Sequence, residues 1–201
     1  MTNNIKIKSE EVLSDNFFPL KNVTYEFQKQ DGSVEEIRRE VYQSRNGATA
    51  LLYNPASGKV ILIKQFRLPA YLNEDPTGML WETCAGLLEE NEYPKDSVLR
   101  EIEEETGYKV DDADKIFELY STAGSVTEML HFFVAEYSDE QRVGKGGGLE
   151  EENEEIEVVE MPFEEALRKI DTGEIKDAKT VILLQYAKLN LFKEEKVFDL
   201  L

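Results

Sequence analysis

The stretch that most constrains this chain lies between residues 86 and 108, where glycines, an arginine and several glutamates stand at fixed spacings. The polar positions of this pattern are Gly86, Glu92, Arg100, Glu101, Glu104, Glu105 and Gly107. Pro94 suits the first turn of a helix, and Gly107 suits a left-handed residue just past its end. We therefore predict a helix of about three turns between Pro94 and Gly107.

Apolar and acidic residues alternate along this predicted helix with helical spacing. Val98, Leu99 and Ile102 stand three and four positions apart and are expected to face the core. Glu101 and Glu105 share another face, where two carboxylates about 5–6 Å apart can be bridged by divalent cations. Arg100 precedes Glu104 by one turn and is expected to hold its carboxylate by a charge-assisted hydrogen bond.

A solvated acidic surface is the alternative interpretation of the glutamates at 103–105, since runs of like charge commonly serve solubility alone. However, three negative charges in the last turn oppose the helix dipole, at about 0.3–1 kcal/mol for each exposed charge. A bound cation would compensate this cost. The spacings of Gly86, Glu92 and Arg100 add further weight, so we favour a metal-dependent hydrolase.

Composition narrows the classes of partner. The 201 residues include 42 acidic and 23 basic side chains, and the resulting net charge of −19 disfavours binding to nucleic acid or to an anionic membrane. The single cysteine, Cys84, excludes an internal disulfide and is interpreted as a small buried residue. His131 is the only histidine, which disfavours a zinc cluster or a catalytic triad. With no apolar run of membrane-spanning length, the protein is expected to be soluble and cytoplasmic.

The order of the predicted elements indicates an α+β fold with a mixed sheet packed between helices. Strands are predicted at residues 23–27, 34–41, 48–53, 60–66, 115–120, 130–137 and 156–160, and further helices at 162–171 and 178–192. Asp31-Gly32 is a strong turn signal between the first two strands. We predict an N-terminal β segment at residues 1–45 that serves dimerisation and a catalytic domain at residues 46–201. The glycine-rich and acidic residues 138–155 are expected to form a mobile loop.

The predicted ligands indicate the reaction class. Carboxylate oxygens without histidine or thiolate favour Mg²⁺ or Mn²⁺ over zinc. Mg²⁺ keeps water ligands and shares phosphate oxygens, which indicates phosphoanhydride hydrolysis. Such a reaction needs a further carboxylate as general base. Within the acidic run 151–155 we predict Glu154 as the first candidate and Glu152 as the second.

The pattern from Gly86 to Gly107 resembles the signature of the Nudix hydrolases, and only Tyr108 departs from the usual aliphatic residue at its end. From about residue 13 to residue 180 the chain is similar to the GDP-mannose pyrophosphatase branch of that family, which is close to the ADP-ribose pyrophosphatases. The shared segments include Leu13-Ser14-Asp15-Asn16, Gln65-Phe66-Arg67, Cys84-Ala85-Gly86-Leu87-Leu88 and Val126-Thr127-Glu128.

The resemblance implies a Nudix-type α/β/α sandwich and a homodimer whose N-terminal strands help to form the partner's nucleotide pocket. It also implies Mg²⁺-dependent cleavage of a nucleotide sugar, with GDP-mannose going to GMP and mannose 1-phosphate. ADP-ribose hydrolysis is the alternative, and a non-catalytic nucleotide sensor is a third. Ala123, which stands where the ADP-ribose branch has proline, favours GDP-mannose.

The same resemblance implies roles for individual residues. The implied metal ligands are the carbonyl of Ala85 and the carboxylates of Glu101, Glu104, Glu105 and Glu154, with Glu152 as the alternative to Glu154. The implied catalytic set comprises Glu154, Glu152, Glu105 and Arg100. The implied substrate contacts are Phe17, Arg38, Arg39, Glu40, Arg67, Ala85, Gly86, Leu87, Glu128 and Lys179. Phe17 replaces a tyrosine of the GDP-mannose enzymes and lacks its hydroxyl.

Overall fold

The structure is a computed structural model that describes residues 4–73, 75–149 and 155–192. The chain forms two compact units. One comprises Met1–Asn46 and Tyr120–Leu130, and the other comprises Gly47–Leu119 and His131–Leu201.

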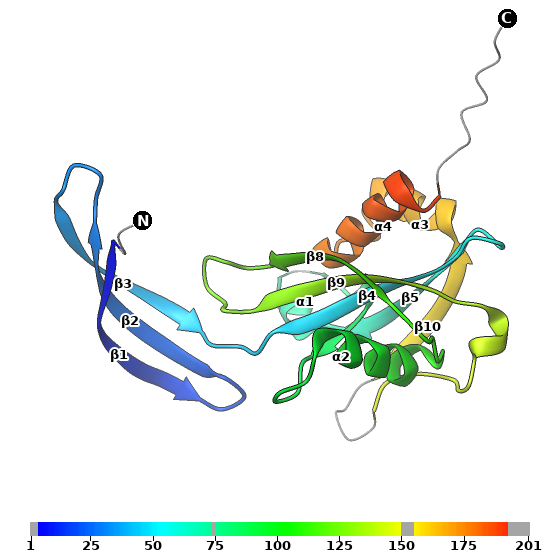
Figure 1. Ribbon diagram of the computed structural model, residues 1–201, viewed down its shortest axis with the longest axis horizontal. Coiled ribbons are helices and arrows are strands. Elements are labelled where there is room, and N and C mark those ends of the chain that lie inside the picture. The colour runs from blue at the N-terminus through cyan, green and yellow to red at the C-terminus, as the bar shows by residue number, and fades with distance from the viewer. Residues whose placement is uncertain (1–3, 74, 150–154, 193–201) are drawn as a thin grey trace, which may run out of the picture. The chain divides into compact units, whose positions relative to one another are not determined.

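The first unit contains a three-stranded antiparallel sheet in the order β1-β2-β3, coloured blue in Figure 1. Its strands are β1 (Ile5–Asp15), β2 (Pro19–Gln28) and β3 (Val34–Tyr42). The predicted turn between β2 and β3 is present, with Gly32 at a φ of +85°. Strand β1 was not predicted, because its register with β2 shifts at two points and interrupts the alternation that marks a strand.

The segment Tyr120–Leu130 joins this unit through the backbone of β3. The N–H of Tyr42 donates to the carbonyl of Ser125 at 2.8 Å, and the N–H of Thr127 donates to the carbonyl of Tyr42 at 3.1 Å. Glu128 therefore lies on a segment that is hydrogen-bonded to the end of β3.

The second unit is built on a seven-stranded sheet with the main order β10-β5-β4-β9-β8, to which β6 adds beside β5 and β7 beside β4. The strands are β4 (Gly47–Asn54), β5 (Lys59–Phe66), β6 (Met79–Glu82), β7 (Cys84–Leu87), β8 (Asp114–Tyr120), β9 (Met129–Glu136) and β10 (Ile156–Pro162). The strands predicted from apolar runs are confirmed. The short β6 and β7 were not predicted, because four residues are too few to show a period.

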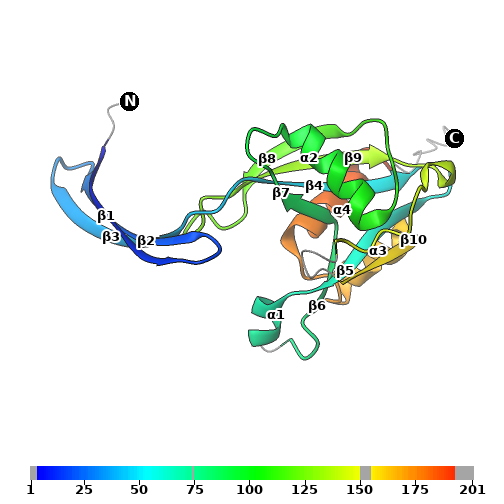
Figure 2. The same cartoon turned by 90° about the horizontal axis from the view of Figure 1, so that it is seen from below.

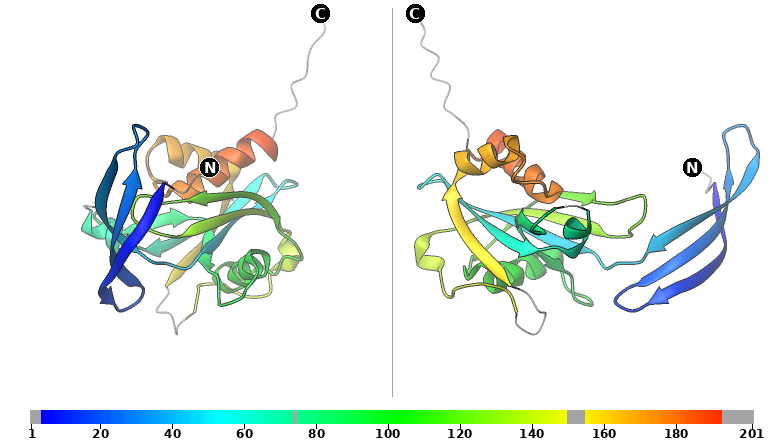
Figure 3. Two further views of the ribbon diagram at one scale, coloured as in Figure 1. Left: turned by 60° about the vertical axis from the view of Figure 1, so that its left-hand side comes forward. Right: turned by 180° about the vertical axis from the view of Figure 1, so that it is seen from behind.

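Helices cover both faces of this sheet. The helical elements are α1 (Leu68–Leu72), α2 (Pro94–Glu101), a π-helical turn (Ile102–Thr106), a 3₁₀ turn (Asp139–Gln141), α3 (Phe163–Asp171) and α4 (Ala178–Asn190). Helices α3 and α4 pack on one face and α2 on the opposite face (Figures 1 and 3). Helix α1 lies beside β6 (Figure 2). The predicted sandwich is thus confirmed. Among the described residues, none of the helices combines the length and apolarity that a membrane crossing requires.

The core explains why α2 lies where it does. Ala48, Ala50 and Leu52 of β4 alternate along one face of the strand and pack with Val98 and Ile102, all of them buried. This confirms the predicted inward face of the helix. The packing fixes α2 against β4 and β7.

Candidate functional site

The helix that carries the glutamates begins as predicted but ends differently. Pro94 occupies its first position, and Gly107 closes it in the left-handed conformation with φ +76°. The helix predicted between Pro94 and Gly107 is present, but its α-helical part ends at Glu101 and continues as the π-helical turn Ile102–Thr106. Turns of this kind are frequent at functional sites. The turn carries Glu104 and Glu105.

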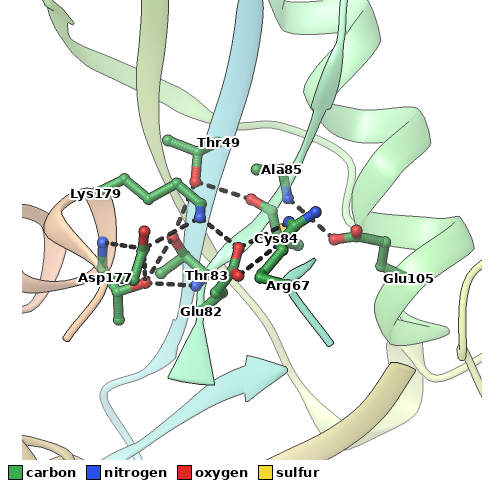
Figure 4. A network of polar contacts seen from close by, with 10 residues as sticks. Thr49, Arg67, Glu82, Thr83, Cys84, Ala85, Glu105, Asp177 and Lys179 are labelled. Carbon is green, nitrogen blue, oxygen red and sulfur yellow. Dashed lines mark hydrogen bonds and ion pairs between the residues drawn. The ribbon is translucent and has the colours of Figure 1, made fainter. Parts of the chain in front are cut away.

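Two carboxylates of this helix lie against the same two residues of β7. The Glu105 side chain is almost fully buried, with 1% of the residue exposed, and its Oε2 accepts a hydrogen bond from the N–H of Ala85 at 3.0 Å (Figure 4). The carboxylate of Glu101 lies so close to Gly86 that a Cβ atom there would be 1.9 Å from its Oε1. The structure thus brings Glu101 and Glu105 together at Ala85-Gly86, as their spacing predicted.

Arg100 connects the remaining acidic residues of the motif. Its Nη1 donates to Glu101 at 2.8 Å and to Glu104 at 2.9 Å, and its Nε donates to Glu92 at 3.1 Å. The predicted contact with Glu104 is therefore present. Burial lowers the pKa of Arg100, but its bonds to these carboxylates outweigh burial and raise the pKa, so the guanidinium stays charged. A single cation thus holds the three carboxylates in place.

The glycine-rich segment 144–148 packs against the end of the π-helical turn. The N–H of Gly147 donates to the carbonyl of Glu105 at 2.9 Å, and that of Gly148 donates to the carbonyl of Glu104 at 3.3 Å. A Cβ atom at Gly146 would lie 2.4 Å from the carbonyl oxygen of Glu105. Residues 144–148 form a loop, as expected, and their glycines permit its close backbone contact with the π-helical turn.

The donor set of this site fits a hard divalent cation. Glu101, Glu104 and Glu105 offer only carboxylate oxygens, which Mg²⁺ and Mn²⁺ prefer. Within the described ranges, no three Asp, Glu, His or Cys side chains are grouped so as to hold a metal alone. Mg²⁺ can bind with few protein ligands, because water molecules and substrate phosphate oxygens complete its coordination. The predicted ligands Glu154 and Glu152 lie outside the described residues.

The only cysteine and the only histidine take no part in this donor set. Cys84 is buried, its thiol donates to the carbonyl of Ala50 at 3.3 Å, and burial raises the pKa of the thiol well above its usual range. This confirms Cys84 as a small core residue. His131 lies on β9 with its Nδ1 3.3 Å from a carboxylate oxygen of Glu118.

A second charged cluster lies at the end of β6 and was missed from the sequence. Glu82 is buried and accepts two hydrogen bonds from Arg67, from Nε at 2.7 Å and from Nη2 at 2.8 Å (Figure 4). Lys179 donates to the same carboxylate at 2.5 Å and also contacts Asp177 at 3.1 Å. Two residues predicted to bind substrate, Arg67 and Lys179, therefore share one anion. The only sequence signal for Glu82 was that it directly follows the apolar run Met79-Leu80-Trp81.

This cluster remains charged at neutral pH. Burial raises the pKa of the Glu82 carboxyl, but the hydrogen bonds and charges of Arg67 and Lys179 outweigh burial and bring that pKa below its usual value. Burial lowers the pKa of Arg67, and the bond to Glu82 more than offsets it. The cluster therefore consists of ions held by one another.

The other predicted substrate contacts have these positions. Gly86 and Leu87 lie on β7, where they pair with Ala48 and Gly47 of β4. Phe17, Arg38, Arg39, Glu40 and Glu128 all belong to the first unit. Phe17 lies between β1 and β2 with 78% of its surface exposed, and its ring meets that of Phe18 edge to face. The two arginines and Glu40 are exposed on β3. The role of these five residues toward a substrate stays a prediction.

Comparison with known proteins adds the family. The family model of the NUDIX domain matches residues 43–184, and that of the GDP-mannose pyrophosphatase NudK N-terminal domain matches residues 4–42. The GDP-mannose pyrophosphatase of Cronobacter sakazakii is 50% identical over 189 residues, covering 94% of this chain and 97% of that protein. The GDP-mannose pyrophosphatase of Escherichia coli O1:K1 is 50% identical over 190 residues, covering 94% and 98%.

A solved structure shares the fold. The crystal structure of an ADP compounds hydrolase superposes with a TM-score of 0.70 over 91% of each chain, at 18% sequence identity. Since the NUDIX domain match spans well over half of the chain and curated relatives share half of its residues, the chain belongs to the Nudix hydrolase family.

Proposed function

We propose that this hydrolase cleaves the pyrophosphate bond of a nucleotide sugar, and that its preferred substrate is GDP-mannose, which yields GMP and mannose 1-phosphate. The observation that carries the reaction class is the placement of the Glu101 and Glu105 carboxylates against Ala85-Gly86. The substrate is supported by the GDP-mannose pyrophosphatases that are 50% identical over almost the whole chain.

Nudix hydrolases generally use divalent metal ions, and here we propose Mg²⁺, for which Mn²⁺ can substitute. Its ligands would be the Ala85 carbonyl and the carboxylates of Glu101, Glu104, Glu105 and Glu154. When bound, the ion would neutralise phosphate charge and lower the pKa of the attacking water. Arg100 orients Glu101 and Glu104 through its hydrogen bonds, and the Ala85 N–H orients Glu105.

The general base belongs to the acidic run after the glycine-rich segment. We propose Glu154 first and Glu152 second as the group that takes the proton of the attacking water. The described residues on both sides of this run support the proposal. Gly148 is bonded to the carbonyl of Glu104, and the N–H of Ile156 donates to the carbonyl of Gly147 at 3.2 Å, so these flanking residues lie beside the π-helical turn.

Substrate binding requires cations in a chain of net charge −19, because a diphosphate would otherwise be repelled. We propose that Arg67 and Arg38 neutralise the phosphates, since arginine suits bidentate contact with phosphate oxygens. Lys179, Arg39, Glu40 and Glu128 would contact the rest of the nucleotide sugar, and Phe17 would stack on the base.

We also propose a homodimer in which the N-terminal strands contribute to the partner's site. Three apolar residues of β1, Ile5, Ile7 and Val12, are each more than half exposed, and a second chain would cover them. Light scattering should give twice the chain mass of 23.1 kDa. A mass of one chain would contradict the dimer.

The function is tested by incubating the purified chain and Mg²⁺ with a panel of nucleoside diphosphate derivatives and identifying products by mass. We expect the highest kcat/KM for GDP-mannose, with GMP and mannose 1-phosphate as products and no turnover in EDTA. A higher kcat/KM for ADP-ribose would support the alternative activity. Absence of turnover with every compound would contradict hydrolysis and favour a nucleotide sensor.

The base is identified in the same assay with two matched variants, Glu152→Gln and Glu154→Gln. We expect the larger fall in kcat for Glu154→Gln, because the amide cannot accept the proton. A larger fall for Glu152→Gln would move the role to that residue. Small, equal effects would contradict both assignments.

A further inference from the structure

Glu82 is an almost fully buried charge near the proposed site, and three N–H groups converge on it. Only 2% of its side chain is exposed, and it accepts from two nitrogens of Arg67 and from Lys179. A carboxylate removed from water in this way is stable only because cations replace its hydration. Its position therefore determines the positions of both cations.

Glu82 binds one edge of the Arg67 guanidinium and leaves other N–H groups of this side chain for a further ligand. A guanidinium has five N–H groups in a planar fork, and Glu82 engages those of Nε and one of Nη2. The two N–H groups of Nη1 and the second of Nη2 point along the other edges of the plane. The Arg67 side chain is 39% exposed, so one edge is fixed on Glu82 while the side chain stays accessible. A phosphate can be bound bidentately at the accessible edge.

Lys179 is held from two sides. Its ammonium contacts Glu82 and Asp177, and Asp177 also caps α4 by accepting from the N–H of Thr180 at 3.0 Å. The cap fixes the position of Asp177. A change of the Lys179 rotamer would therefore break its ion pair with Glu82 or with Asp177. Glu82 thus connects the start of α4 with Arg67 at the end of β5.

A short stretch of chain connects Glu82 with Ala85, whose N–H binds Glu105 of the proposed metal site. The N–H of Thr83 donates to Thr180 Oγ1 at 2.8 Å, and the hydroxyl of Thr83 lies 2.9 Å from that of Thr49. Two residues later, the N–H of Ala85 binds Glu105 (Figure 4). Glu82 and Ala85 are three extended residue steps apart, which span at most about 10 Å.

We infer that Glu82 is a positioning residue, which holds Arg67 and Lys179 in register with Glu101 and Glu105 so that both cations meet the substrate already oriented. This inference rests on the proposed function. Without Glu82 the two cations would repel each other, and Arg67 would regain the rotamer freedom that binding must then remove. We therefore expect removal of the Glu82 carboxylate to weaken substrate binding more than it slows the chemical step.

The test compares Glu82→Gln with the wild-type chain in steady-state hydrolysis of GDP-mannose with Mg²⁺. Glutamine keeps the volume, but its NH₂ group opposes one of the N–H donors. We expect KM to rise at least about tenfold while kcat changes less than threefold, because the substrate must order the cations itself. An unchanged KM would overturn the inference.

A matched control separates positioning from general destabilisation. Lys169→Met removes another buried cation, which pairs with Glu174 at 2.6 Å and lies 5.0 Å from the centre of the Trp81 ring. We expect this variant to lower the Tm with KM unchanged. Equal rises of KM in Lys169→Met and Glu82→Gln would overturn the inference.

A second pair of variants covers the case in which Glu82→Gln alone does not fold. Lys179→Met leaves Glu82 bound to Arg67, and Lys179→Met/Glu82→Gln removes one cation together with one anion, so the cluster stays balanced. We expect a higher KM for the double variant than for Lys179→Met, because in the double variant Arg67 also loses its carboxylate partner. The same KM in both variants would overturn the inference.

Calorimetric titration of the same variants with GDP-mannose in EDTA separates this inference from the proposed function. If the wild-type chain binds GDP-mannose in EDTA but does not hydrolyse it with Mg²⁺, the proposed function fails, while a weaker Kd for Glu82→Gln still supports positioning. If the wild-type chain neither binds nor hydrolyses GDP-mannose, both fail.

Discussion

Replacing Glu105 with glutamine is expected to lower kcat for GDP-mannose by at least about 10²-fold while the fold stays intact. The side chain is buried, and its Oε2 accepts from the N–H of Ala85. Glutamine can keep that bond through its carbonyl oxygen, so packing should change little. What it removes is the negative charge, and with it one hard ligand for the divalent ion.

Steady-state kinetics across a range of Mg²⁺ concentrations, together with thermal unfolding, measure this effect. Glu103→Gln is the matched control, because Glu103 stands in the same turn but is partly exposed, and its carboxylate pairs with Lys109 at 3.2 Å. We expect its kcat to stay within about twofold of wild type, as is usual for surface substitutions. Near-normal turnover in Glu105→Gln would remove this residue from the metal site.

Local spacing was sufficient to predict much of this site. Val98 and Ile102 are buried, Gly107 adopts the left-handed conformation, and Arg100 binds Glu104, each as the helical period requires. All three features depend on residues within one or two turns of each other, which is the range over which sequence patterns are informative.

The features that escaped prediction depend on distant partners. The carboxylate of Glu82 is paired with Arg67, 15 residues earlier, and with Lys179, 97 residues later. Nothing in the neighbouring residues of Glu82 specifies such partners. The π-helical turn escaped for a related reason, because its end is fixed by hydrogen bonds from Gly147 and Gly148, which lie about 40 positions further along the chain.

The glycines of the segment 144–148 show why composition alone is ambiguous. A glycine run is typical of a flexible loop, and equally of a segment whose backbone approaches another closely. Only the structure distinguishes the two cases, since a Cβ atom at Gly146 would collide with the backbone of Glu105 and Thr106. The same distinction leads to a prediction at Gly86, where the atom in the way belongs to a side chain.

Replacing Gly86 with alanine is expected to lower kcat/KM by about 10²-fold, because a reacting group displaced by about 1 Å can cost that much. The new Cβ would lie 1.9 Å from Oε1 and 2.1 Å from Cδ of Glu101, so this carboxylate must move. Its movement also disturbs the bond from Arg100. Gly86 does not have a positive φ, and the flexible side chain can yield, so the free energy of unfolding should change little.

Gly146→Ala is the instructive contrast, because there the clash is with backbone. Its Cβ would lie 2.4 Å from the Glu105 carbonyl oxygen, and the residue has φ +68°. We expect its free energy of unfolding to fall by at least about 1–2 kcal/mol from the conformation alone. Gly124→Ala, with open space around the new atom, should match wild type in both measurements.

Kinetics and thermal unfolding of the three variants therefore separate the two kinds of contact. Wild-type kcat/KM in Gly86→Ala would show that the position of Glu101 does not matter for turnover, whereas equal destabilisation of Gly86→Ala and Gly146→Ala would show that the lost activity reflects damaged packing.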